Sequence, residues 1–262
     1  MDLGIRGRKA IVNGGSGGLG KGSALALAAE GVDLTLAARG EERLQATAEE
    51  IRERTGANVT CVAADHSTTE GRERILAACP EPDILVSTCS PPPFSGDFRA
   101  VSTEDWMEHL AMGLVGPVEF MKAVVDGMAE RRFGRIVNIT TGASKYPAEI
   151  RILSGPPRAA LSNYTTAVSK VVARHNVAIN NLLPGMHHTD AALNRFGKQA
   201  EKEGRSYDEV VADFCRDWRI PAERFGDPEA FGAICAMLCS AHASYVIGQD
   251  IVVDGGVGNS TF

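Results

Sequence analysis

Short apolar runs alternate along the chain with longer segments in which apolar residues recur every three or four positions. The short runs are rich in Val, Ile and Leu, which is typical of buried β-strands. We predict strands at residues 9–13, 32–38, 58–65, 82–88, 134–140, 177–183 and 250–255. The longer segments predict helices at residues 21–31, 41–56, 69–79, 103–132, 158–175 and 228–239.

The alternation of strands and helices predicts an α/β fold. Strands that are apolar along their whole length are buried on both faces, as in a parallel sheet covered by helices on both sides. We therefore expect a doubly wound, seven-stranded parallel sheet. No linker, repeat or composition shift divides residues 1–262, so a single domain is expected. The longest polar insertion, residues 191–220, is expected to be a substrate lid.

Charge and composition exclude several classes of protein. A net charge of −6 argues against a nucleic-acid partner, because phosphate binding relies on an excess of Lys and Arg. The chain reaches glycine before any long N-terminal apolar run, and it nowhere contains the roughly 18 consecutive apolar residues of a membrane helix. We expect a cytoplasmic protein without a membrane partner. The six cysteines lack CxxC spacing, so no metal site is expected.

The stretch NGGSGGLG, residues 13–20, follows the first predicted strand and opens the first helix. Glycines in this context allow a tight turn and leave helix amides free to meet a dinucleotide pyrophosphate. The stretch satisfies both GxGxxG and the wider GxxxGxG spacing. The residues expected to bind the cofactor here are Gly14, Ser16, Gly18, Leu19 and Gly20.

The end of the second predicted strand indicates which dinucleotide is bound. A carboxylate there would accept from the ribose 2′-hydroxyl of NAD, but this chain has Ala38 followed by Arg39. The cation favours NADP, with NAD as the alternative if Arg39 is only a solvated loop residue. Asp65, at the end of the third strand, is placed to accept from the adenine amino group. Its alternative role is to cap the following helix.

Motifs spread from Arg8 to about Gly256 resemble the short-chain dehydrogenase/reductase family. The matching stretches are NGGSGGLG at 13–20, Asp65, DILV at 83–86, GRIVNIT at 134–140, INNLLPG at 179–185, Thr189, RFGDPEAFG at 224–232 and YVIGQDIVVDGG at 245–256. The resemblance implies a Rossmann fold in a three-layer α/β/α sandwich, a nicotinamide cofactor and a homotetramer or dimer. It also implies that Pro184 and Gly185 line the nicotinamide and that Thr189 contacts its carboxamide or phosphate side.

The positions that carry the family's chemistry differ in this chain. The resemblance places the family tyrosine at Ser154, its lysine at Arg158, its serine at Thr141 and its structural asparagine at Gly113. The NNAG stretch of the family reads STCS at residues 87–90. Because these positions are altered together, the chain resembles a divergent branch in which serine, three residues and arginine replace the tyrosine–lysine pair.

These replacements change the acid–base chemistry that is available. Reduction of a carbonyl needs a proton for the developing alkoxide, and a serine hydroxyl is a far weaker acid than a tyrosine. Ser154 can hydrogen-bond a substrate oxygen, or it can be the N-cap of the following helix. Arg158 stays charged and can stabilise an oxyanion, with a carboxylate-bearing substrate as an attractive partner. Thr141 retains a hydroxyl with which to position the substrate.

A proton donor elsewhere is therefore expected. Lys145 and Tyr146 follow the strand that leads to Thr141, and His187 and His188 follow Pro184–Gly185. All four are expected near the carboxyl ends of the strands, where ligands bind in open α/β sheets, although loop residues of these types are more often solvated surface groups.

The leading hypothesis is an NADP(H)-dependent oxidoreductase that acts on a small carbonyl or alcohol, resembling 3-oxoacyl reductases. Two alternatives use the same scaffold without redox turnover. One is a lyase or isomerase in which Arg158 stabilises charge and a histidine acts as base. The other is a dinucleotide-binding protein without catalysis, since the fold alone does not decide among these functions.

Overall fold

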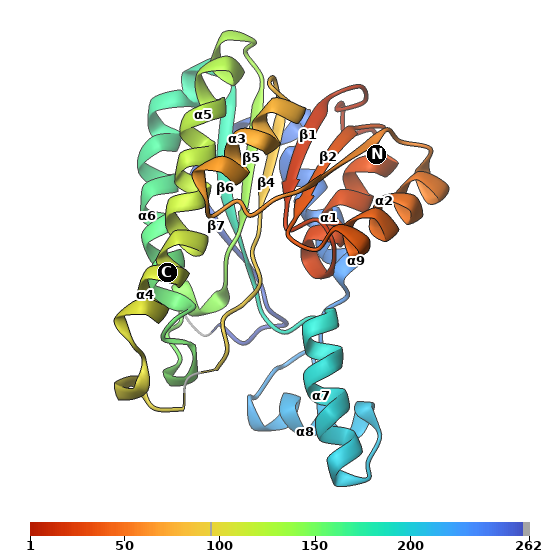
Figure 1. Cartoon of the computed structure of the whole chain (residues 1–262), viewed down its shortest axis with the longest axis vertical. Helices are drawn as coiled ribbons and strands as arrows, with labels where there is room; N and C mark the ends of the chain where they lie inside the picture. The colour runs from red at the N-terminus through yellow and green to blue at the C-terminus, as the bar shows by residue number, and fades with distance from the viewer. Residues whose placement is uncertain (95, 259–262) are drawn as a thin grey trace.

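A seven-stranded parallel sheet forms the centre of the molecule (Figure 1). The structure is a computed structural model that describes residues 1–94 and 96–258. The strands are β1 (Lys9–Asn13), β2 (Asp33–Ala38), β3 (Val59–Ala63), β4 (Ile84–Ser87), β5 (Gly134–Ile139), β6 (Val177–Pro184) and β7 (Asp250–Val253). Their order in the sheet is β3-β2-β1-β4-β5-β6-β7, which confirms the predicted doubly wound Rossmann sheet.

Helices cover both faces of the sheet and complete three layers. They are α1 (Gly18–Ala29), α2 (Glu41–Thr55), α3 (Thr69–Ala78), α4 (Thr103–Leu110), α5 (Gly116–Glu130), α6 (Gly155–Val172), α7 (Asp190–Glu203), α8 (Tyr207–Asp217) and α9 (Pro228–Cys239). Figure 1 shows α3, α5 and α6 over one face and α1, α2 and α9 over the other. Each face has its own apolar core, because strand residues alternate between the two sides.

The predicted helix over residues 103–132 is divided by one π-helical turn, Ala111–Val115, between α4 and α5. Gly113 lies in this turn, where a Cβ would come within 3.2 Å of the Pro157 Cβ. The absence of a side chain therefore lets the start of α6 pack closely here. π-turns of this kind are frequent at functional sites, and this one borders Arg158.

The predicted polar insertion at residues 191–220 is largely helical. Figure 1 shows α7 and α8 beyond the carboxyl end of β6, below the body of the molecule. The two helices bury a small apolar cluster of their own that includes Phe196, Val210 and Phe225. A capping box between Ser206 and Glu209 begins α8, so the sequence carried a helix-start signal within this insertion.

A row of polar side chains crosses the sheet, at or next to the carboxyl ends of β1, β4 and β5 and farther back on β6 and β7. Asn13, Ser87, Asn138, Asn181 and Asp250 are neighbours in register on five adjacent strands. Asn138 Nδ2 donates to Asn181 Oδ1 at 3.1 Å, and Asn181 Nδ2 donates to Asp250 Oδ1 at 2.7 Å. These buried hydrogen bonds hold the strand ends at which the cavity opens.

Among the described helices, none is both long enough and apolar enough to cross a bilayer. The described residues also contain no group of three or more His, Cys, Asp or Glu side chains arranged to hold a metal ion.

Candidate active site

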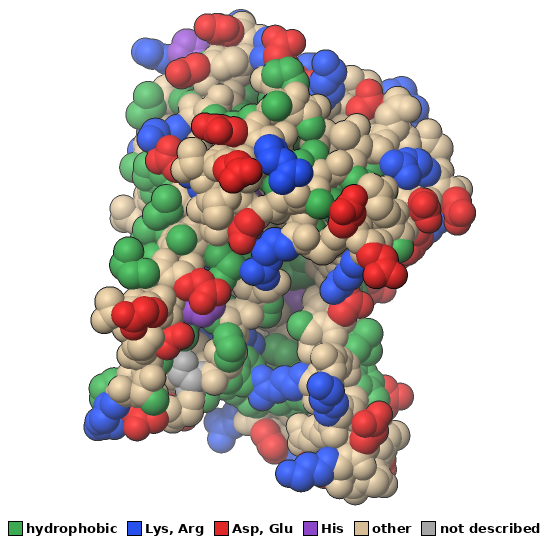
Figure 2. Space-filling model, viewed as in Figure 1, with side chains coloured by type: hydrophobic (Ala, Val, Ile, Leu, Met, Phe, Trp, Pro, Cys, Tyr) green, Lys and Arg blue, Asp and Glu red, His purple; other side chains and the backbone are tan. Residues whose placement is uncertain are grey.

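One cavity of about 670 Å³ lies along the carboxyl ends of the strands. Ligand sites in open α/β sheets occupy this place, and the volume is in the range of small-molecule pockets. Figure 2 shows the molecule hollowed between its two lower lobes, with hydrophobic surface inside and Lys and Arg at the edges. Every residue predicted for the site lines the cavity except Lys145 and His188.

The glycine turn forms a steric cradle at one end of the cavity. Gly14 has φ +73°, and a Cβ there would lie 2.7 Å from the carbonyl oxygen of Thr88. A Cβ on Gly20 would fall on the Gly14 carbonyl. Helix α1 starts at Gly18 after Gly17, which has no side chain to cap it, so its first-turn amides have no side-chain acceptor at the N-cap. This geometry fits the pyrophosphate of a dinucleotide.

Two arginines line the cavity near this cradle. Arg39 follows β2, where Ala38 leaves no carboxylate to repel a 2′-phosphate. Arg43 was not predicted; its Nε donates to the Ser16 carbonyl at 2.9 Å, and its guanidinium pairs with the carboxylate of Asp190. The available signal was a second arginine four residues after Arg39. The residues present therefore fit NADP in preference to NAD.

Asp65 lines the same cavity and does not cap α3. Thr68 is the N-cap, its Oγ1 accepting from the Gly71 amide at 3.0 Å. Asp65 Oδ1 accepts from the amide and hydroxyl of Ser67 at 2.9 and 2.7 Å. Burial raises the pKa of Asp65, but the hydrogen bonds from Ser67 outweigh burial and hold the pKa below its usual range. An ionised carboxylate suits the predicted contact with an adenine amino group.

Pro184, Gly185 and Thr189 line the cavity where β6 ends. The Gly185 amide donates to the Val253 carbonyl at 3.0 Å, and a Cβ on Gly185 would lie 2.7 Å from Cα of Asp254. Thr189 is the N-cap of α7, with Oγ1 accepting from the Ala192 amide at 3.3 Å. Its hydroxyl proton is therefore free to be donated into the cavity.

Ser154 occupies the N-cap position of α6, but its hydroxyl does not cap the helix. A cap accepts from the amide of the second or third helical residue, and here both are prolines, Pro156 and Pro157, which have no N–H. The prediction that the Ser154 side chain caps α6 is therefore wrong. Ser154 is 2% exposed, and its Oγ lies 3.4 Å from Nη1 of Arg158.

Arg158 is 4% exposed and has only neutral hydrogen-bond partners. Its Nη1 donates to the Ser154 carbonyl at 3.2 Å, and its Nη2 donates to Sγ of Cys89 at 2.9 Å. No carboxylate forms an ion pair with it in the described part of the chain. A buried cation is costly without a counter-charge, so the site is suited to receive negative charge.

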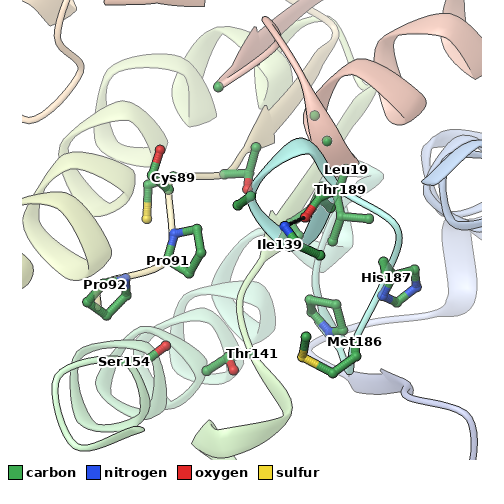
Figure 3. Close-up of a pocket in the computed structure, with 18 of the residues that line it drawn as sticks. Leu19, Cys89, Pro91, Pro92, Ile139, Thr141, Ser154, Met186, His187 and Thr189 are labelled. Carbon is green, nitrogen blue, oxygen red and sulfur yellow. Dashed lines mark hydrogen bonds between the residues drawn. The ribbon is translucent and has the colours of Figure 1, made fainter. Parts of the chain in front are cut away.

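Thr141 lies beside Ser154, between the two sides of the cavity (Figure 3). Figure 3 places Cys89, Pro91 and Pro92 on one side and Met186 and His187 on the other. The segment after Thr141 packs on the start of α6, where a Cβ on Gly155 would come within 2.8 Å of the Ala143 carbonyl oxygen. Thr141, two residues after β5, and Ser154, directly before α6, thus both line the cavity.

The four candidate proton donors divide into two pairs. Tyr146 and His187 line the cavity, whereas Lys145 and His188 do not. Lys145 is exposed, with Nζ 5.9 Å from the ring centroid of Tyr146. The His188 ring packs against Tyr207 and Phe225, and its Nδ1 lies 3.0 Å from the Tyr207 hydroxyl oxygen.

His187 is 6% exposed and packs edge-on against Phe231. Its Nδ1 lies 3.2 Å from the Gly185 carbonyl oxygen. Burial lowers the pKa of His187, so the imidazole is neutral near pH 7. A neutral imidazole is a poor general acid, which leaves Tyr146 as the titratable hydroxyl in the described lining.

Three further lining residues were missed by the sequence reasoning. The guanidinium carbons of Arg151 and Arg195 lie 4.0 and 3.7 Å from the ring centroid of Phe94. Arg151 precedes α6 and Arg195 lies on α7, while Phe94 follows β4. No local motif links positions so distant in the chain, so their convergence is visible only in the fold.

A family model described as enoyl-(acyl carrier protein) reductase matches residues 14–258. The 3-oxoacyl-[acyl-carrier-protein] reductase FabG of Aquifex aeolicus is 30% identical over 265 residues, which cover 98% of this chain and 100% of that protein.

Solved structures are similar over almost the whole chain. The L-sorbose reductase of Gluconobacter frateurii, complexed with NADPH and L-sorbose, superposes with a TM-score of 0.94 at 26% identity, covering 99% of this chain and 100% of that one. A protein described as a short chain dehydrogenase/reductase family protein has a TM-score of 0.84 at 27% identity and covers 98% of each chain.

Proposed function

The chain belongs to the short-chain dehydrogenase/reductase family, and from this premise we propose that it reduces a small carbonyl compound with NADPH. The proposal rests on the contents of one cavity. A single cavity joins a dinucleotide cradle, with two arginines beside it, to a pair of hydroxyls backed by a buried arginine. Relatives described as reductases, one of them holding NADPH, support the direction of the reaction and the choice of cofactor.

The glycine turn and the first turn of α1 would hold the pyrophosphate, and Arg39 and Arg43 would hold the 2′-phosphate. Pro184 and Gly185 would border the nicotinamide. When bound, NADPH supplies the hydride that the carbonyl carbon accepts.

Ser154 and Thr141 are proposed to hold the carbonyl oxygen. Because Nη1 of Arg158 donates to Ser154 Oγ, the serine proton is free to be donated to the substrate. The charge of Arg158 then stabilises the negative oxygen as it develops, without moving a proton. In this assignment Ser154 and Arg158 supply positioning and electrostatics, and the acid is a different group.

Tyr146 is proposed as that acid. A phenol has an ordinary pKa near about 10 and is a much stronger acid than an aliphatic hydroxyl. Tyr146→Phe is expected to lower kcat by about 10- to 100-fold with little change in the Kd of NADPH. Ser144→Ala, on the same segment, is the matched control. Equal kcat values in Tyr146→Phe and the wild type over the whole pH range would show that Tyr146 is not the acid.

Residues 191–220 are proposed as a lid on the single domain formed by the rest of the chain. Helix α7 brings Arg195 and Phe196 to the cavity lining, and the cluster shared with α8 gives the lid internal rigidity. A segment that is packed internally can move as one body over the substrate.

We also propose a cytoplasmic homo-oligomer, a tetramer or dimer. Three large apolar side chains are exposed: Met107 on α4 by 62%, Val115 at the end of the π-helical turn by 44% and Val171 on α6 by 65%. A second copy of the chain would cover such residues. Light scattering on the purified protein measures the mass, and a monomer at micromolar concentration would contradict the proposal.

The test of the reductase function begins with binding. NADPH, NADP and NADH are titrated against the protein by nicotinamide fluorescence, and NADPH oxidation is then followed with a panel of ketones, oxo acids and sugars. Tight binding of NADPH with oxidation by at least one compound supports the proposal. Binding without any turnover, or no binding of any dinucleotide, overturns it.

A further inference from the structure

Four of the five arginines in the described cavity lining form no ion pair, and three of these four lie at the substrate end. Arg151, Arg158 and Arg195 come from the segment before α6, from α6 itself and from α7. Within the described residues, no ion pair joins any of them to a carboxylate. By contrast, Arg43 at the other end of the cavity is paired with Asp190.

The contacts of these arginines are with neutral groups. Arg151 and Arg195 lie against the ring of Phe94, and Nη2 of Arg151 lies 3.6 Å from Sδ of Met186. Arg158 donates to a serine, a carbonyl and a thiol. Rings and sulfur atoms hold the guanidinium planes in place but neutralise none of their charge. Several strong N–H donors are left for a ligand.

The carboxylates of the cavity do not supply the missing charge. Asp65 accepts from Ser67, and Asp190 is paired with Arg43. Asp254 accepts from the amides of Gly256 and Gly258 at 2.9 and 2.7 Å. The acids of the described lining are thus occupied elsewhere, and the substrate end carries an excess of positive charge.

Electrostatics indicate that this arrangement is costly without a ligand. Burial lowers the pKa of Arg151 to about 10, and the charges of Arg195 and Arg158 add to the lowering. Repulsion between like charges in a partly buried site destabilises the folded state, so a bound anion would relieve it. Guanidinium forks match the planar oxygens of a carboxylate and the oxygens of a phosphate.

We propose that the substrate is a small carbonyl compound with an anionic oxygen group, either a carboxylate or a phosphate, and that Arg151, Arg158 and Arg195 bind this group beside Phe94. That the substrate has a carbonyl group rests on the proposed reductase function. That it has an anionic group rests on the three arginines alone. Nη1 of Arg158 donates to Ser154 Oγ, so this arginine lies where the proposed carbonyl oxygen binds, and its charge also acts on Arg151. Arg195 lies on α7, so the lid takes part in recognition.

Binding to the protein–NADP complex tests the proposal by calorimetry, without turnover. One arm compares acetoacetate with its methyl ester, and the other compares dihydroxyacetone phosphate with dihydroxyacetone. At least one anion is expected to bind about tenfold or more tightly than its neutral partner, and that arm identifies the source of the anionic group. Equal affinity within both pairs overturns the proposal.

Variants locate the site. Arg195 is exposed, so Arg195→Gln is expected to fold normally. Arg151→Gln is the second variant, and thermal melting checks that it folds. Each is expected to remove most of the preference for the anion while leaving the Kd of NADPH unchanged. Lys198→Gln removes the same charge from α7 outside the lining and is expected to behave as wild type.

The outcomes separate this proposal from the reductase function. Weakened NADPH binding in Arg195→Gln and Arg151→Gln would show that the arginines serve the cofactor phosphates, which overturns the inference. Arginine-dependent anion binding in a protein that oxidises NADPH with no compound would sustain the inference and refute the reductase function.

Discussion

The cofactor end and the substrate end of the cavity are built in different ways. At the cofactor end, eight consecutive residues form the turn, and the site is shaped by backbone amides and by the absence of side chains. At the substrate end, single side chains converge from Cys89, Thr141, Arg158 and Arg195, on four separate segments. A backbone cradle depends on local spacing, whereas a cluster of side chains depends on the whole fold. The two ends should therefore respond differently to substitution.

The largest expected effect is at the cofactor end. Gly20→Val places a side chain on the Gly14 carbonyl, so NADPH binding is expected to weaken by about a hundredfold or more, because the turn cannot open without disrupting α1. Nicotinamide fluorescence measures the loss. Gly197→Ala, a glycine on α7 with open space around it, is the control and is expected to retain full affinity. Wild-type affinity in Gly20→Val would mean that the cradle is not the binding site.

Arg158→Met changes the substrate end alone. The variant removes a buried charge at the substrate end, so kcat is expected to fall by about a hundredfold while the Kd of NADPH stays within about twofold. Steady-state kinetics and fluorescence titration measure the two quantities on the same preparation, with thermal melting as the check on folding. A parallel loss of NADPH affinity would erase the distinction between the two ends.

A smaller effect is expected for the 2′-phosphate. Arg39→Ala and Arg43→Ala should each raise the KM for NADPH by about tenfold and leave the KM for NADH unchanged, because NADH lacks that phosphate. Arg6→Ala, which removes an arginine outside the cavity lining, serves as the control. Equal effects on both cofactors would place the two arginines against a group that the cofactors share.

The smallest expected effect concerns His187. Burial lowers the pKa of His187 in the folded state, whereas the unfolded chain takes up a proton below about pH 6.5. The unfolded state then binds more protons, so stability falls as the pH drops below that value. The melting temperature of the wild type should decline more between neutral and mildly acidic pH than that of His187→Gln. The exposed His242→Gln should keep the wild-type decline.

The difference between local spacing and long-range packing explains which features could be predicted from the sequence. The seven parallel strands and the glycine turn could be predicted, because apolar runs and glycine spacing report local geometry. The lid helices were not predicted as helices, since their polar faces hid the small cluster around Phe196, although the capping box at Ser206 marked one start. The capping role given to Ser154 was avoidable, because the two prolines after it are visible in the sequence.

The substrate end could be predicted only in part. Thr141, Ser154 and Arg158 were found from the family pattern, but Arg151, Arg195 and Phe94 carry no local signal. Adjacent pairs were also difficult to separate, since Lys145 and Tyr146 differ only in which side chain the turn directs inward. Side-chain direction in irregular segments depends on packing against distant elements, which one-dimensional spacing does not encode.

The close packing of Gly113 against Pro157 and Arg158 couples two positions that are far apart in the sequence. A Cβ at position 113 would already lie 3.7 Å from Nη1 of Arg158, so an asparagine amide and the guanidinium would compete for one space. A larger side chain at position 113 is therefore expected to shift the guanidinium. The two positions are coupled, so the free-energy costs of substitutions at 113 and 158 should not add.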